Sequence, residues 1–544
     1  MKTRYSALFL LFCLTATTAI QAQIQSVDYP VYSNKSSESV EITRVERNDT
    51  ATIVFMDVYN RPDNWVRISS RSTLQGLTTG KNYKLLSSKG FELDKQNFMP
   101  ASGNASFQLF FEPIDKKEQK ISFIEGPNNG DYTVENIELN ENYKKSRIRC
   151  RLSGTVIDRP QSSRLIICKD MSQVRNNQWL SIPIRDGKFD YTFYTDIEDR
   201  YYLMFWDEYI GGAMRPEQFF AENGEIQFTL HPMTMEEPIT NYTKTTCPLT
   251  KELLSYKEKE KKTFNFDDIR AAEDALEKAD GYYTETYKAF WKKFDETTDR
   301  TEKDKLYNER DSLEESGAFY TEAAQALSQK SRLRYDSLIA WRLEYIKQYA
   351  SLPCLYLLQE TVDYFKHTKK DFTPCIDIYH KVFEKKFAKH PASKSFQQFV
   401  DGLLVKVGST YVNFTAPDLQ GNPVQLSDMI ANKVALIDLW ASWCGPCRRS
   451  SISMIPLYNK YKDKGFVIVG IAREKGTTKD MEAAIKKDGY TWLNLVELND
   501  RAQIWSKYGI SNAAGSTFLV DKSGRILAIN PSAEEVEAIL EKNL

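Results

Sequence analysis

The sequence predicts a multidomain protein with N-terminal β-sandwich domains, a helical middle segment and a C-terminal α/β domain. Apolar residues alternate with period two near the N-terminus, recur at helical spacing in a charged middle region, and form continuous buried strands between helices near the C-terminus. A chain of 544 residues is also too long for one hydrophobic core. The expected division is a leader over 1–22, a β-sandwich domain over 23–143, a small all-β domain over 144–235, a helical segment over 236–405 and the α/β domain over 406–544.

The leader has the pattern of a secretory signal peptide. Lys2 and Arg4 precede an apolar stretch, and Ala22 is a suitable cleavage residue. The stretch is short for a membrane span, and Cys13 lies too deep in it, after the bulky Phe12, to be a lipoprotein cysteine. We therefore expect export to the periplasm.

Charge and hydropathy exclude two classes of partner. Lys plus Arg number 73 and Asp plus Glu number 74, so a net charge of −1 gives no overall attraction to nucleic acid. Beyond the leader, no stretch is long and apolar enough to cross a bilayer. We expect no nucleic-acid partner and no membrane span in the mature chain.

Two consecutive regions have the pattern of antiparallel β-sheet. In the first, Gly, Asn and Pro separate runs in which alternate residues share one face. In the second, short apolar runs predict further strands, and Asp186 with Gly187 supplies the positive φ angles of a tight hairpin. The clearest shared faces in the first region are Thr52, Val54, Met56 and Val58, and Phe107, Leu109 and Phe111.

The helical segment contains aromatic stripes, which we interpret as core. Such residues at helical spacing are more often the interior of a bundle than a ligand groove. Pro353 and Pro374 separate helices. The histidines are scattered along the chain, so no metal site is expected among them. The stripes are Tyr283, Tyr287, Phe290 and Phe294, and Leu338, Trp341, Tyr345 and Tyr349.

Strands and helices alternate in the last region. Continuous apolar runs at 433–440 and 465–472 predict strands buried on both faces, with a helix between them. Gly524 follows Ser523 in a hairpin turn, and Ser532 begins a capping box on the final helix. In such α/β layers, sites form at the carboxyl ends of the strands.

Two cysteines separated by a Gly-Pro pair follow the first of these strands. The helix N-terminus that begins there favours an anion and lowers a thiol pKa from about 8.5 to about 7 or below. We expect Cys444 to be the more exposed, attacking thiolate, and Cys447, one turn along, to resolve the mixed disulfide. Gly445 leaves the approach open, and Pro446 lies at an early helical position where its missing N–H costs little.

Two alternatives for this cysteine pair are weaker. A zinc site needs two further ligands, and the sequence has no second Cys-x-x-Cys and no nearby histidine pair. A purely structural disulfide is the other alternative. Elsewhere, Cys150 with Cys168 or Cys354 with Cys375 could pair, but buried free thiols are favoured. No metal and no cofactor is expected.

The segment VALIDLWASWCGPCRRS resembles the active-site segment of the thioredoxin superfamily. APDLQGNPVQLSD and TFLVDKSGRI resemble its TlpA-like branch of exported thiol-disulfide oxidoreductases. The resemblance covers about residues 407–544 and implies a thioredoxin-like fold. It matches Cys444 and Cys447 to the attacking and resolving cysteines and Trp443 to the tryptophan beside the disulfide. It matches Asp438 to a buried acid that accepts the proton lost by Cys447; a purely structural carboxylate is the alternative.

The layout resembles multidomain Bacteroidetes members of this family, in which a small all-β domain often precedes the thioredoxin-like one. Three departures concern substrate handling. The family's cis-proline before TFLV, which helps to hold substrate backbone, has no counterpart, and Ser511 or Gly515 stands near its place. Ser450 stands where relatives often have an acidic residue, and the usual proline of this helix is shifted to Pro456. The candidate substrate-binding residues are Trp443, Gly445, Pro446 and Gly515.

We expect an exported thiol-disulfide oxidoreductase that acts on protein disulfides. The Gly-Pro pair matches thioredoxin, whose potential is about −270 mV against about −120 mV for the oxidant DsbA, which favours a reductant or isomerase re-reduced by a membrane electron donor. The rival hypothesis is a binding or scaffold protein with a redox-inert thioredoxin-like module, because the proline is missing. A peroxidase is weaker still, since its relatives use a lone cysteine in a different motif.

Overall fold

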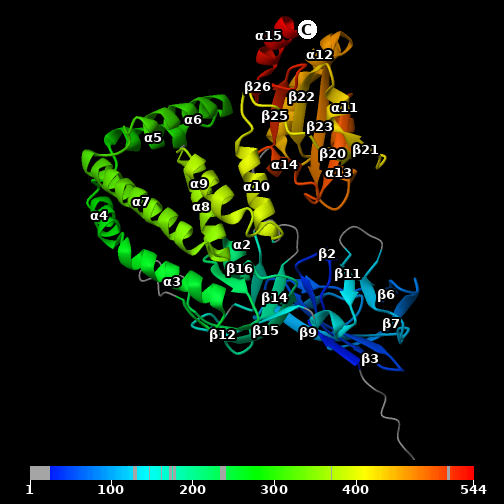
Figure 1. Ribbon diagram of the computed structural model, residues 1–544. Coiled ribbons are helices and arrows are strands. Elements are labelled where there is room, and N and C mark those ends of the chain that lie inside the picture. Colours follow the sequence, from blue (N-terminus) through cyan, green and yellow to red (C-terminus); the bar gives the residue numbers. More distant parts are fainter. Residues whose placement is uncertain are drawn as a thin grey trace, which may run out of the picture. The chain divides into compact units, whose positions relative to one another are not determined.

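The computed structural model describes residues 25–126, 131–145, 147–160, 162–170, 174, 179–212, 214–232, 241–368, 370–510 and 515–544. The predicted signal peptide lies outside these residues. The chain divides into two compact units, Met1–Lys251 and Glu252–Leu544 (Figure 1). No helix among the described residues has the length and apolarity to span a membrane.

The first unit begins with a nine-stranded antiparallel sheet in the order β1-β3-β4-β9-β7-β6-β10-β11-β2. The predicted faces are confirmed, because Val54 and Leu109 are fully buried. Val54 of β4 and Phe123 of β10 belong to one core, so the sheet folds over itself as a sandwich. The strands are β1 Gln25–Asp28, β2 Asn34–Lys35, β3 Val40–Arg47, β4 Thr52–Tyr59, β6 Thr73–Gly76, β7 Asn82–Lys89, β9 Asn104–Phe111, β10 Lys120–Ile124 and β11 Thr133–Glu138, with the short pair β5 Trp65–Val66 and β8 Asn97–Phe98.

A second β-sandwich follows, with sheets β15-β12-β18-β19 and β14-β13-β16-β17 around one core. Asp186 and Gly187, at φ of 50° and 66°, make the predicted tight turn. The predicted hairpin pairs only Arg185 with Lys188, because the turn leads from β14 in one sheet to β15 in the other. The elements are η1 Glu141–Lys144, β12 Ile148–Val156, β13 Arg164–Cys168, β14 Leu180–Pro183, β15 Lys188–Thr195, β16 Asp199–Phe205, α2 Trp206–Gly211, β17 Glu217–Ala221, β18 Gly224–Leu230 and β19 Tyr242–Thr245.

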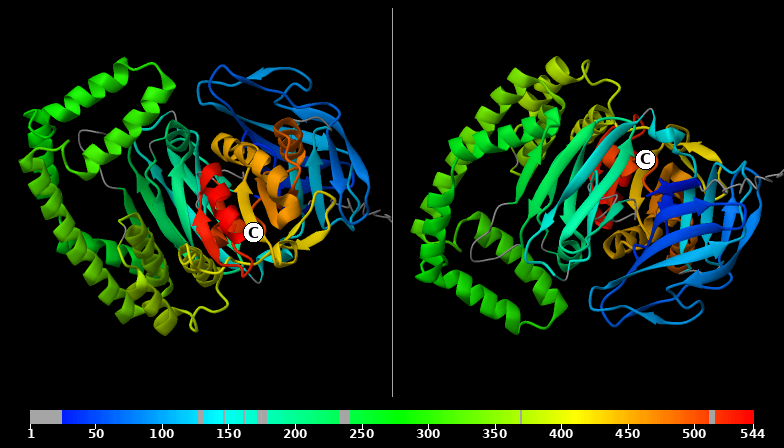
Figure 2. Two further views of the ribbon diagram at one scale, coloured as in Figure 1. Left: turned by 90° about the horizontal axis from the view of Figure 1, so that it is seen from above. Right: turned by 90° about the horizontal axis from the view of Figure 1, so that it is seen from below.

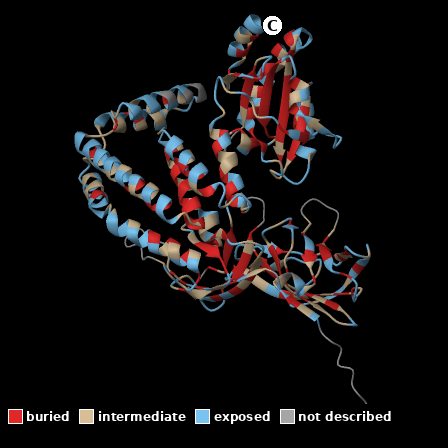
Figure 3. Ribbon diagram, viewed as in Figure 1, coloured by how far each residue is buried: buried red, intermediate tan, exposed pale blue. Residues whose placement is uncertain are grey.

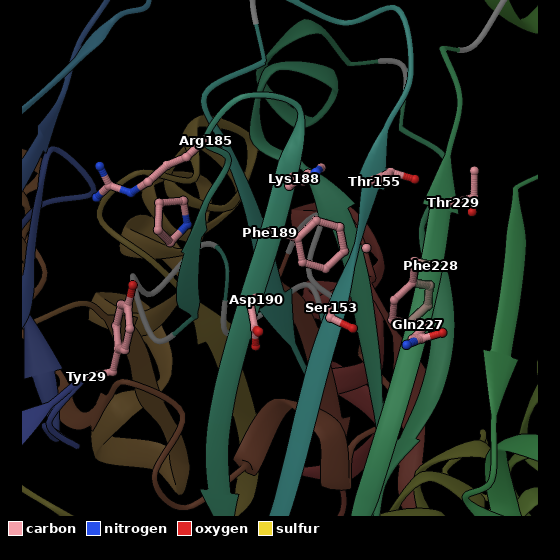
Figure 4. Close-up of a pocket in the computed structure, with 12 residues that line it drawn as sticks. Tyr29, Ser153, Thr155, Arg185, Lys188, Phe189, Asp190, Gln227, Phe228 and Thr229 are labelled. Atoms are coloured by element: carbon pink, nitrogen blue, oxygen red, sulfur yellow. The ribbon is translucent and has the colours of Figure 1, made fainter.

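A hollow of about 740 Å³ lies on the first sheet of this sandwich (Figure 4). Ser153 and Thr155 of β12 line it, together with Asp190 of β15. The Asp190 carboxylate already accepts hydrogen bonds from Arg151 Nε and Nη2, at 2.9 and 2.5 Å. None of the lining residues belongs to the predicted redox site.

The helical segment begins with α3, which starts just before the end of the first unit, and continues through the second unit. Phe290 is buried in a small aromatic cluster that Tyr287 and Phe294 also join, so the interpretation as core holds for this stripe. Tyr283 precedes α5 rather than lying in it, and Tyr349 is exposed, so each stripe is shorter than predicted. The elements are α3 Pro248–Thr263, α4 Asp267–Lys278, α5 Glu285–Glu296, α6 Arg300–Glu315, α7 Glu322–Tyr349, α8 Leu352–His367, α9 Thr373–Ile378, η2 Tyr379–Phe383 and α10 Pro391–Leu403.

The C-terminal domain is a five-stranded sheet in the order β24-β23-β22-β25-β26. The first three strands are parallel, β25 runs antiparallel to them, and β26 runs antiparallel to β25 and so in the same direction as the first three. Every residue of β22 is buried, as its apolar run predicts (Figure 3). Helix α12 packs against β22, β23 and α15 (Figure 2). The elements are β20 Thr415–Pro417, β21 Pro423–Gln425, α11 Leu426–Ile430, β22 Val434–Trp440, α12 Gly445–Tyr461, η3 Lys462–Lys464, β23 Phe466–Glu474, α13 Lys479–Asp488, β24 Leu493–Leu498, α14 Ile504–Lys507, β25 Ser516–Val520, β26 Ile526–Ile529 and α15 Ala533–Asn543.

Local signals in this domain are confirmed. The Ser532 hydroxyl accepts from the Glu535 N–H and the Glu535 carboxylate accepts from the Ser532 N–H, which completes the capping box. Gly524 has φ of +85° in the β25–β26 turn. These signals depend only on neighbouring residues, so the sequence reveals them directly.

A glycine in β23 is required by packing at the centre of this sheet. Trp440 Nε1 donates to Asn494 Oδ1 at 3.0 Å, and a Cβ on Gly470 would lie 2.2 Å from that oxygen. We predict that Gly470→Ala displaces Asn494 and lowers the free energy of unfolding by about 1–3 kcal/mol. Thermal unfolding measures this. Gly445→Ala is the control, because its added Cβ meets only Arg449 at 3.6 Å; equal midpoints for the two variants would contradict the prediction.

Candidate functional site

Cys444 lies where β22 gives way to α12, as predicted. The Cys444 N–H donates to the Ala441 carbonyl at 3.0 Å, which closes the turn between the two elements. Cys444 is the N-cap residue of α12, and its Sγ accepts from the Cys447 N–H at 3.3 Å. A helix N-terminus carries unpaired N–H groups and partial positive charge. The Cys444 sulfur therefore lies where a thiolate is stabilised.

Cys444 and Cys447 form a disulfide. The expectation that Cys444 would be the more exposed of the two is wrong, because Cys444 is 4% exposed and Cys447 8%. The reason is the turn that precedes α12, in which Cys444 is buried while Trp443, Gly445 and Pro446 are exposed. These three exposed residues flank the buried Cys444 in the sequence.

Trp443 directly precedes Cys444 in the chain, and Gly515 is hydrogen-bonded to Cys447. The Trp443 side chain is half-exposed and its ring centroid lies 6.2 Å from that of Trp505 on α14. The Gly515 N–H donates to Cys447 Sγ at 3.2 Å. A Cβ on Gly515 would lie 1.8 Å from the Leu439 carbonyl oxygen, so only glycine allows this approach. Ser511, the other candidate near the missing proline, lies outside the described residues.

Asp438 is buried in β22 and is hydrogen-bonded to α12. Its carboxyl is 3% exposed, and burial raises its pKa to about 7, while a hydrogen bond from Ser451 Oγ to Asp438 Oδ2 at 2.6 Å opposes that rise. The same hydroxyl lies 3.0 Å from the Cys447 carbonyl oxygen. Ser451 thus connects the acid to the backbone of Cys447.

Sequence reasoning missed Ser451. The signal was present, because Ser451 follows Cys447 by four residues and so lies on the same face of α12. It also missed Arg448, whose Nε and Nη2 donate to Asp488 at 2.6 and 2.7 Å. The Arg448–Asp488 pair joins α12 to α13, a contact between elements that no local pattern announces.

The remaining thiols are separate from this chemistry. Burial raises the pKa of Cys150, Cys168 and Cys375 to about 12, which keeps these thiols protonated and unreactive. Cys150, Cys168, Cys247, Cys354 and Cys375 are all buried and free, as the sequence favoured. Among the described residues, no group of three or more His, Cys, Asp or Glu side chains gathers as metal ligands would.

The C-terminal domain is similar to known redox proteins. A family model described as redoxin matches residues 406–544. The thiol-disulfide oxidoreductase ResA of Geobacillus kaustophilus is 31% identical over 147 residues, which are 26% of this chain and 81% of the relative. ResA of Bacillus anthracis is 28% identical over 149 residues, with 26% and 82% covered.

Solved structures give similar matches. The thioredoxin domain of a thiol-disulfide oxidoreductase from Bacteroides vulgatus is 30% identical, with 25% of this chain and 96% of that chain covered and a TM-score of 0.23. A thiol:disulfide interchange protein from Bacteroides sp. is 30% identical, with 25% and 90% covered and a TM-score of 0.24.

The contact between Gly515 and Cys447 predicts a specific defect. Gly515→Ala forces the start of β25 away from Leu439, so the N–H no longer reaches Cys447 Sγ and the Cys447 thiolate loses a donor. A hydrogen bond to a charged group is worth about 1.5–3 kcal/mol, so resolution of a preformed Cys444–glutathione mixed disulfide slows by about tenfold or more. Chromatography of the released glutathione measures the rate. Gly445→Ala is the control for an added methyl group in the same site. Equal rates of glutathione release from Gly515→Ala and Gly445→Ala would refute the prediction.

The raised pKa of Asp438 predicts opposite effects on activity and stability. Below pH 7 the acid is protonated and accepts no proton, so we expect insulin reduction to accelerate as pH rises through about 7. An unfolded aspartate has a pKa of about 3.9. The folded state therefore binds more protons between about pH 4 and 7, and stability falls as pH rises through that window.

Asp438→Asn removes the titration. We expect activity at pH 8 to fall by about tenfold or more and the acceleration with pH to disappear. We also expect the variant to be more stable than wild type at pH 8 by about 2–4 kcal/mol. Insulin turbidity and thermal unfolding across pH 5–9 test both. An unchanged pH profile of activity would leave Asp438 a structural carboxylate.

Proposed function

Because this chain belongs to the TlpA-like branch of the thioredoxin superfamily and is a thiol-disulfide oxidoreductase, we propose that it is exported and reduces or isomerises disulfides of client proteins. The observation that carries the proposal is the position of Cys444 Sγ at the N-terminus of α12, 3.3 Å from the Cys447 N–H. A sulfur held there is stabilised as the thiolate, which is the nucleophile in disulfide exchange.

The first step is attack by the Cys444 thiolate on a client disulfide. A bond forms between Cys444 Sγ and one client sulfur, the client S–S bond breaks, and the other client sulfur leaves as a thiolate. Trp443, Gly445 and Pro446 are exposed around the disulfide and supply the surface that a client chain contacts. The Gly515 backbone completes that surface where the family has a proline.

The second step is resolution. The Cys447 thiolate attacks Cys444 Sγ, which re-forms the enzyme disulfide and releases the second client thiolate, so the client gains two electrons and the enzyme loses them. Cys447 must first lose its proton. Asp438 accepts it in this proposal, since burial raises the pKa of its carboxyl to about 7 and the carboxyl is hydrogen-bonded to Ser451, one helical turn after Cys447.

The direction of electron flow rests on the residues between the cysteines. A Gly-Pro pair is that of thioredoxin, a reductant at about −270 mV, rather than of the oxidant DsbA at about −120 mV. A reductant needs a source of electrons outside the cytoplasm, so we propose a membrane dithiol donor. In the proposal, the leader over 1–22 directs export to the periplasm, and the upstream β domains and helices select or position the client.

We predict that wild type accelerates insulin reduction by dithiothreitol and that Cys444→Ser abolishes the acceleration. Equilibration with glutathione gives a potential nearer −270 than −120 mV. No difference between wild type and Cys444→Ser would support a binding or scaffold protein with an inert module instead. A potential close to that of DsbA would reverse the direction and leave the enzyme assignment intact.

Clients are identified by trapping. Cys447→Ala leaves the attacking sulfur without its resolving partner, so mixed disulfides persist and mass spectrometry identifies the attached proteins. Cys444→Ala/Cys447→Ala is the matched control, because it retains the fold and every free buried thiol. Proteins recovered equally with both variants are not clients.

A further inference from the structure

Ser442 lies in the turn between β22 and α12, two residues before Cys444, and all of its polar groups are bound. Its N–H donates to Glu474 Oε1 at 2.7 Å, and its hydroxyl donates to Glu474 Oε2 at 2.7 Å. Its carbonyl accepts from Arg448 Nη1 at 3.3 Å. The turn between β22 and Cys444 is therefore held by the side chains of Glu474 and Arg448.

Glu474 is the last residue of β23, the strand that runs parallel to β22. Glu474 is 4% exposed, and burial raises its pKa. A buried acid at the end of this strand lowers the stability of the fold unless hydrogen bonds offset its desolvation. Both of its oxygens receive their hydrogen bond from Ser442. Both hydrogen bonds of the Glu474 carboxylate thus come from Ser442, which lies two residues before Cys444.

Arg448 completes the anchorage from the helix. Its guanidinium is held by Asp488 at the end of α13, so its contact with the Ser442 carbonyl is fixed in turn. Ser442 is consequently bound to β23 through Glu474 and to α12 and α13 through Arg448. A shift of the turn would move Cys444 away from the Cys447 N–H.

We propose that Glu474 is a positioning residue, which acts through Ser442 to hold Cys444 Sγ against the N-terminal N–H of α12. The inference deepens the proposed disulfide exchange and rests on it, but its readouts use no client protein. Glu474 touches no sulfur in this role. It sets the geometry in which Cys444 reacts.

Two substitutions separate geometry from charge. Glu474→Gln removes the charge but keeps the length, so its amide oxygen accepts the Ser442 N–H and its amide nitrogen donates to the Ser442 oxygen. Glu474→Asp keeps the charge but withdraws the carboxylate by about 1.5 Å, the length of one carbon–carbon bond. If Glu474 positions Cys444, the reactivity of Cys444 falls in the Asp variant and stays close to that of wild type in the Gln variant.

The experiment measures alkylation of Cys444 by iodoacetamide in the reduced full-length chain from pH 5 to 9, and the midpoint potential against glutathione. We expect Glu474→Asp to lower the alkylation rate at pH 7 by about fivefold, which is the loss of thiolate when the profile moves up by one pH unit. We expect Glu474→Gln to stay within about twofold of wild type.

Glu497→Asp is the matched control. Glu497 is 2% exposed, lies on the neighbouring strand β24 and accepts the Ile504 N–H at 2.8 Å, but it has no contact with Ser442. We expect its alkylation profile to match wild type. A wild-type profile in Glu474→Asp, or equal shifts in the Gln and Asp variants, would overturn the positioning role and leave a structural or purely electrostatic one.

Ser442→Ala tests the same contact if the Glu474 variants do not fold. It removes only the hydroxyl bond and keeps the N–H bond, so we expect a smaller shift of the same sign, about twofold at pH 7. An unshifted profile in a folded Ser442→Ala together with an unshifted potential would also overturn the proposal. If wild type fails to reduce insulin, the proposed function fails, whereas these profiles still report on Glu474.

Discussion

The hydrogen bond from the Cys447 N–H to Cys444 Sγ is the contact on which the site depends. It makes Cys444 the N-cap residue of α12. The Cys444 sulfur accepts the hydrogen bond that a Ser or Asp side-chain oxygen accepts at the start of other helices. The same N–H groups that need a partner at any helix N-terminus stabilise negative charge on this sulfur. In the proposed function, this hydrogen bond both caps the helix and stabilises the nucleophile.

The surrounding residues keep that interaction in place from several sides. Gly515 brings a backbone N–H to the second sulfur, and the Leu439 carbonyl leaves no room for a side chain there. Asp438 lies behind the pair with Ser451 as its only hydrogen-bond donor among the described contacts. Glu474 and Arg448 hold the preceding turn through Ser442. These residues come from β22, β23, α12 and the chain just before β25.

Buried acids gather at the carboxyl ends of the parallel strands. Asp438 lies on β22, Glu474 ends β23 and Glu497 lies near the end of β24. Burial raises the pKa of both Asp438 and Glu497 to about 7. Such groups destabilise a fold unless hydrogen bonds offset their desolvation. Asp438 and Glu474 are hydrogen-bonded to Ser451 and Ser442, which adjoin the disulfide, whereas Glu497 accepts from the Ile504 N–H at the start of α14.

The sequence by itself determined many of the elements of the C-terminal domain and the position of the cysteine pair between a strand and a helix. The apolar run of β22, the helix that starts after Cys444 and the capping box at Ser532 all depend on residues within a few positions of one another, so local pattern suffices. Only the tertiary structure decided what surrounds the pair. Glu474 is 32 residues from Ser442, and Gly515 is 68 residues from Cys447. Such contacts exist because strand order brings distant segments to one sheet edge, and neither periodicity nor spacing records that order. The burial of Cys444 was misjudged for the same reason, since exposure is a property of the packed turn and not of the motif.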